Sequence, residues 1–76
     1  MKNKCFLTST IRRENDGFVS LCPELDIASQ GDTVEEAARN LKEAVELFLE
    51  CADAEEMSRS LSGEVYISHF EASYAT

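Results

Sequence analysis

The chain has 76 residues, 43% of them hydrophobic, and a formal net charge of −8 at neutral pH. This composition indicates one small globular domain and excludes a disordered chain. No apolar run approaches the ~18 residues of a membrane-spanning helix and no signal-peptide pattern is present, so we expect a cytoplasmic protein without a membrane partner.

Three strands are predicted in the first half of the chain. Residues 4–14 are rich in β-branched and aromatic side chains and predict the first strand. Asn15-Asp16-Gly17 predicts a hairpin turn, because Asp-Gly tolerates positive φ, and residues 18–22 predict the returning strand. Pro23 ends that strand, and residues 27–30 predict a short third one.

Residues 31–54 carry the strongest helix signal. Thr33 and Glu36 predict a capping box, in which Glu36 reaches back to the Thr33 amide, and Gly31 permits a tight turn before it. We expect about 22 helical residues. The apolar positions follow the 3.6-residue period of one helix face: Val34, Ala37, Ala38, Leu41, Val45, Phe48, Leu49 and Ala52.

The rest of the chain predicts a loop or frayed turn at residues 54–63, a fourth strand at 64–70 and a loose tail at 71–76. The expected fold class is therefore α+β, with the order β-β-β-α-β and one long helix packed on one face of an antiparallel sheet. We expect a single domain over residues 1–76, with its core at about 3–70.

One helix covers only one face of such a sheet, and both faces of the predicted strands carry large apolar side chains. We therefore expect a homo-oligomer, either a dimer or a tetramer, that associates through the sheet. The residues predicted to mediate self-association are Phe6, Phe18, Tyr66 and Phe70.

Acidic residues are concentrated between residues 14 and 56, where thirteen of them accompany only Arg39 and Lys42. Such a surface repels phosphates, so we expect no direct nucleic-acid binding and, instead, attraction of a basic protein. The alternative is that the acids form only a solvated helix face.

The sequence contains no recognisable catalytic or phosphate-binding motif, and we expect no enzyme activity, no catalytic residue, no cofactor and no metal. The cysteines Cys5, Cys22 and Cys51 are too widely spaced for a zinc site; we expect reduced, mostly buried thiols, with a redox switch as the alternative. His69, on an alternating strand, is expected to be partly buried or at an interface.

Four linked motifs occur in one order: Asp16-Gly17-Phe18-Val19, Cys22-Pro23-Glu24-Leu25, Ser29-Gln30-Gly31-Asp32-Thr33, and a helix with Glu-Glu-Ala and Asn-Leu-Lys-Glu-Ala. With them the chain resembles the HicB family of antitoxins over about residues 3–70. The resemblance implies a partial ribonuclease-H-like fold without its nuclease activity, since no acidic metal-binding set can be placed. It also implies an antitoxin that binds and neutralises a HicA-type toxin, a small basic ribonuclease that cleaves mRNA.

Members of the family commonly continue into a DNA-binding segment, whereas this sequence stops at Thr76, so DNA binding is not expected of this domain. The alternative function is a stand-alone oligomeric regulatory or structural module with no toxin. The signature turns around Pro23 and Gly31 have structural explanations of their own. The acids predicted to contact a basic partner are Glu24, Glu35, Glu43 and Glu46.

Overall fold

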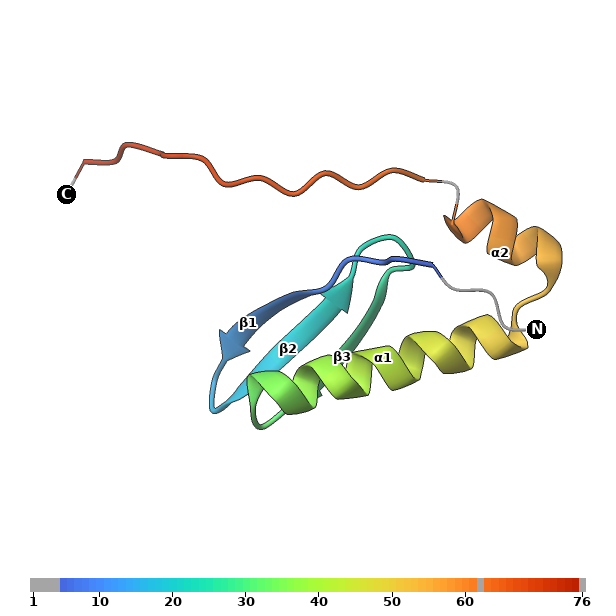
Figure 1. Cartoon of the computed structure of the whole chain (residues 1–76). Coiled ribbons are helices and arrows are strands. Elements are labelled where there is room, and N and C mark those ends of the chain that lie inside the picture. Colours follow the sequence, from blue (N-terminus) through green and yellow to red (C-terminus); the bar gives the residue numbers. More distant parts are fainter. Residues whose placement is uncertain (1–4, 62, 76) are drawn as a thin grey trace.

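The computed structural model describes residues 5–61 and 63–75 and has an α+β architecture (Figure 1). Its elements are β1 (Thr10–Glu14), β2 (Gly17–Cys22), β3 (Ile27–Gly31), α1 (Val34–Cys51) and α2 (Ala54–Leu61). The strands form an antiparallel sheet in the order β1-β2-β3. The predicted α+β class and its β-β-β-α order are confirmed.

A two-residue loop joins β1 to β2, and Glu14 lies opposite Gly17 across the hairpin. The predicted turn is confirmed, but the residue that adopts positive φ is Asn15, at 55°, and not Gly17. Gly17 is needed for space instead, because a Cβ there would lie 3.0 Å from the carbonyl oxygen of Gly31.

The core lies between α1 and one face of the sheet. The buried apolar side chains of Cys22, Leu41 and Val45 form its centre, and Leu7, Leu25, Ile27 and Leu49 pack around them half-buried. Ser20 is also buried, and its hydroxyl donates to the carbonyl oxygen of Ala37 at 2.9 Å. Helix α1 packs chiefly on β3, less on β2 and least on β1. The β1 side of the core is therefore the less covered side.

Helix α1 begins as the sequence predicts. The Thr33 hydroxyl accepts from the Glu36 amide at 3.0 Å, but the Glu36 carboxylate accepts from the Asp32 amide at 3.2 Å and not from Thr33. The helix has 18 residues, fewer than expected, and Ala52 caps its C-terminal end in an extended conformation.

The expected loop at residues 54–63 is wrong, because α2 occupies most of this stretch. The Asp53 carboxylate accepts from the Glu56 amide at 2.7 Å, which caps a new helix immediately after the first one ends. Ser62, also in the expected loop, lies outside the described residues.

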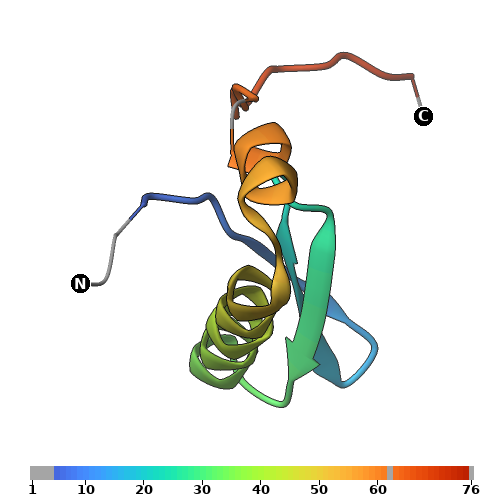
Figure 2. The same cartoon turned by 90° about the vertical axis from the view of Figure 1, so that its right-hand side faces the viewer.

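The extents of the outer strands differ from the prediction. Pairing in β1 starts only at Thr10, so residues 5–9 form an unpaired arm, and Lys4 lies outside the described residues. The predicted fourth strand at 64–70 does not join this chain's sheet. Residues 63–75 leave α2 and stay apart from the sheet in both views (Figures 1 and 2), and all of them are exposed. Alternating side chains favour an extended backbone, but a strand forms only where a free edge lies within reach.

Neither described helix has the length and apolar character needed to cross a membrane.

Gly31 tests how tightly α1 packs against the sheet. A Cβ at this position would lie 2.6 Å from the Ala37 amide nitrogen and 2.8 Å from the Glu36 carbonyl carbon, so Gly31→Ala must displace the helix backbone. We expect a loss of about 1–3 kcal/mol in the free energy of unfolding, measured by urea titration.

Gly63→Ala is the matched control, because no atom lies within 4 Å of a Cβ at that position. It should change the free energy of unfolding by less than about 0.5 kcal/mol. Equal stability of the two variants would show that α1 does not pack as closely as described.

Candidate protein-interaction site

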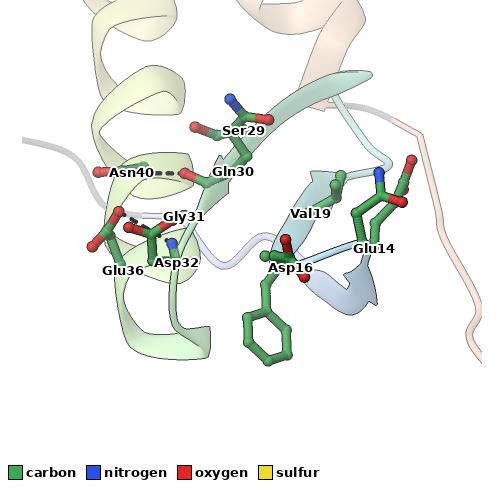
Figure 3. Close-up of a pocket in the computed structure, with 12 residues that line it drawn as sticks. Glu14, Asp16, Val19, Ser29, Gln30, Gly31, Asp32, Glu36 and Asn40 are labelled. Atoms are coloured by element: carbon green, nitrogen blue, oxygen red, sulfur yellow. Dashed lines mark hydrogen bonds between the residues drawn. The ribbon is translucent and has the colours of Figure 1, made fainter.

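An open hollow of about 660 Å³ lies at the end of the sheet where the β1–β2 hairpin meets the turn from β3 into α1 (Figure 3). Four carboxylate residues line it: Glu14, Asp16, Asp32 and Glu36. Antiparallel pairing puts them together, because β2 begins at the same end of the sheet at which β3 finishes. We call this feature the acidic hollow.

Two hydrogen bonds fix the α1 side of the acidic hollow (Figure 3). The Asn40 side-chain amide donates to the carbonyl oxygen of Gln30 in β3 at 2.8 Å, and the Asp32 amide donates to the Glu36 carboxylate at 3.2 Å. These contacts hold the helix against the rim of the sheet. The hollow is therefore preorganised on that side.

The chemistry of the acidic hollow favours cationic side chains. Within residues 5–61 and 63–75, no cluster of three or more His, Cys, Asp or Glu side chains is arranged to hold a metal ion. Carboxylates at such a rim can accept charge-assisted hydrogen bonds from lysine or arginine. Arg12 already pairs with Glu14 at 3.4 Å, but both side chains are largely exposed and such a pair contributes little.

The predicted partner-binding acids occupy other places. Glu35, Glu43 and Glu46 are exposed on α1, and none of the four predicted acids lines the acidic hollow. The sequence analysis did not single out this hollow as a site. A usable signal was present, because acids flank both the hairpin turn and the start of the helix, and a β-β-β-α order brings these two turns together.

Glu24 binds within its own chain. Its carboxylate accepts from the Thr8 amide at 2.9 and 3.1 Å and from the Thr8 hydroxyl at 2.7 Å, and it contacts the Cys22 thiol at 3.7 Å. These contacts attach the arm at residues 5–9 to the core. Its role toward a partner stays a prediction.

The same contacts perturb two pKa values. Desolvation favours a higher pKa for Glu24, but the hydrogen bonds from Thr8 outweigh it, so the pKa of this carboxyl is lowered from its ordinary 4.5. Burial, helped by the neighbouring Glu24 charge, raises the pKa of the Cys22 thiol from its ordinary 9.0. The thiol is therefore held in its neutral, unreactive form.

The expectation of mostly buried cysteines is wrong, since Cys22 is buried but Cys5 and Cys51 are exposed. Both exposed residues lie beyond the part of the sheet that α1 covers, one in the arm and the other at the last position of α1. Every cysteine of the described residues is a free thiol.

The residues predicted to mediate self-association differ in exposure. Phe6, Tyr66 and Phe70 are 101%, 84% and 88% exposed. Phe18 is half-buried, and the Arg13 guanidinium lies 4.6 Å above its ring centre in a cation–π contact. His69 is exposed as well. Self-association through these side chains stays a prediction, because it requires a second surface that covers them.

The chain is similar to two curated proteins. It is 33% identical over 70 residues to a UPF0150 protein of Helicobacter pylori, which covers 91% of this chain and 97% of that protein. It is 46% identical over 50 residues to a UPF0150 protein of Synechocystis sp., which covers 63% of each. No model of a known protein family matches the chain, and no solved structure matches it.

The Glu24 contacts predict a pH dependence of stability. A carboxyl whose pKa is lower in the folded state stabilises the fold above its unfolded pKa, and this contribution is lost as the pH falls through the folded value. We expect Glu24→Gln to reduce the free energy of unfolding at pH 7, and the difference from wild type to shrink once the pH drops below about 4.5.

Urea titrations between pH 7 and pH 3 measure this difference. Asp26→Asn is the matched control: it neutralises an exposed carboxylate in the same connection, and asparagine tolerates the φ of 55° at that position. A Glu24→Gln curve that stays parallel to wild type across this range would refute the role of the Glu24 charge.

Proposed function

Since the chain belongs to the UPF0150 family, we propose that it is the HicB-like antitoxin that its motifs resemble, which binds and neutralises a small basic HicA-type toxin. The observation that carries this proposal is the acidic hollow, a preorganised concave site lined by four carboxylates. The relatives carry only the family name UPF0150, so the antitoxin role is inferred from the motifs between residues 16 and 50.

The charge of the chain supports a basic partner. A net charge of −8 on 76 residues produces a field that accelerates association with a cationic protein. An enzyme that binds RNA needs a basic surface to attract phosphates. A carboxylate-lined surface that covers it would exclude RNA by occupying the same cationic side chains.

In this proposal the chain inhibits by binding and has no catalytic role of its own. The acids of the hollow, such as Asp16, would receive lysine or arginine side chains of the toxin, and Glu35, Glu43 and Glu46 would extend the contact along α1. Glu24 would act indirectly, by holding the arm at residues 5–9 in place. The complex would form in the cytoplasm, where mRNA is the toxin's target.

A second candidate function is a stand-alone oligomeric regulatory or structural module. The exposed apolar side chains of residues 63–75 favour it, since they offer a surface for self-association that needs no toxin. The two functions differ in whether a HicA-type protein binds.

Calorimetric titration with a candidate HicA-type toxin from the same genome tests the proposal. We expect tight binding that weakens at high salt and stops RNA cleavage. Asp16→Lys in the acidic hollow and Glu43→Lys on α1 should each weaken binding on the order of tenfold, about 1.4 kcal/mol.

Glu55→Lys on α2 is the matched control, because it makes the same change in net charge at an exposed site whose pair with Arg59 is weak. It should affect binding much less than the other two variants. If all three variants lose the same binding affinity, the loss comes from the change in net charge, and the acidic hollow has no specific role. No binding to a folded wild-type sample would favour the module without a toxin.

A further inference from the structure

The C-terminal segment at residues 63–75 is apolar, extended and without contact to the sheet. Of the eight large hydrophobic side chains exposed in the described residues, five belong to it: Val65, Tyr66, Ile67, Phe70 and Tyr74. The Tyr66 hydroxyl donates to Glu64, a neighbour within the same segment. The segment has the alternation of a strand and no partner strand in its own chain.

The sheet has a matching free edge. In the described residues β1 pairs only with β2, so its outer edge presents unpaired backbone groups. At the opposite edge, β3, part of the backbone is already engaged, because Asn40 donates to the Gln30 carbonyl and α1 packs chiefly on this strand. An added strand is therefore more easily accommodated beside β1.

An apolar groove lies on the same side of the molecule. It has a volume of about 210 Å³ and runs between the arm and α1. Leu7, Cys22, Leu41 and Val45 contribute apolar wall, and Thr8, Ser9 and Lys42 also line it. The groove exists because α1 covers β3 and β2 but barely reaches β1. Aliphatic side chains of a strand placed along β1 would fill it and complete the core on this side.

We propose that two copies of this chain exchange their C-terminal segments, residues 64–70 of each copy adding a fourth strand along β1 of the other, with Val65 and Ile67 filling the groove between the arm and α1. The exchange is a reciprocal β-strand addition, which closes a two-fold dimer because each copy uses both its C-terminal segment and its β1 edge. This proposal specifies the geometry of the self-association that was expected from the aromatic residues, and it does not require a toxin.

The occupant is a second copy because the segment stays apart from its own sheet. Figures 1 and 2 show it leaving α2 as an extended, unpaired chain, and Gly63 at its start has no atom within 4 Å of a Cβ position. Tyr66 and Phe70 of two copies would bury roughly 600–1,000 Å² between them. With the aliphatic side chains and the covered edges, the interface reaches the 1,200–2,000 Å² of stable complexes.

Light scattering tests the dimer, and two substitutions in the C-terminal segment test its geometry. We expect a dimer at micromolar concentration, abolished by Ile67→Lys, which places a second cation beside Lys42 in the groove, but retained by Ser73→Lys, which makes the same change in charge beyond the exchanged strand. Both positions are exposed in the single chain, so the fold remains intact by circular dichroism. A monomeric wild type, or an Ile67→Lys variant that still dimerises, would overturn the proposal.

Cross-linking distinguishes strand exchange between two copies from pairing of residues 64–70 with β1 of the same chain. Thr10→Cys and Ser68→Cys are combined in a chain carrying Cys5→Ser and Cys51→Ser, and treated with a short bismaleimide. We expect a covalent dimer on a denaturing gel, and none when Ser58→Cys on α2 replaces Ser68→Cys. A product of monomer mass that is cross-linked within one chain would overturn the exchange. These experiments contain no toxin, so they test the strand exchange by itself. If the chain dimerises but binds no HicA-type toxin, the antitoxin function is refuted and the strand exchange is not.

Discussion

The close approach of α1 to the sheet is the constraint on which the rest of the molecule depends. Three small residues permit it: Gly31 has no room for a Cβ, Ser20 is buried and donates to the Ala37 carbonyl, and Ala37 is itself fully buried. This contact fixes the start of α1 over the ends of β2 and β3. The acidic hollow lies at that end, and β1 is left as the strand that α1 covers least.

The features that local chemistry determines could be predicted from the sequence. The periodicity of α1, its Thr33 cap and the Asn15-Asp16-Gly17 turn each depend on residues close in the chain. A second cap, Asp53 three residues before Glu56, carried equally local information about α2 and went unused. The extent of β1 and the fate of residues 64–70 could not be predicted, because a strand ends where its pairing partner ends.

The acids divide into groups that composition alone cannot separate. Glu24 is committed to Thr8 inside the chain and Glu36 to the Asp32 amide, whereas the outer acids of α1 face solvent. Only the topology brings the acids of two distant turns into one hollow. Charge counting therefore supplies only a hypothesis for the sign of the partner's charge, and the place of the acidic hollow follows from the register of the strands.

The position of Cys22 makes the reactivity of its thiol a measure of how firmly the arm at residues 5–9 is attached to the core. Its thiol is buried, contacts the Glu24 carboxylate that holds the arm, and lines the apolar groove, while Cys5 and Cys51 are already accessible. An alkylating reagent would thus modify Cys5 and Cys51 at once, and Cys22 only when local opening lifts the arm from the core. The delay before Cys22 is modified therefore measures how often the arm lifts, and a molecule bound in the groove would lengthen that delay.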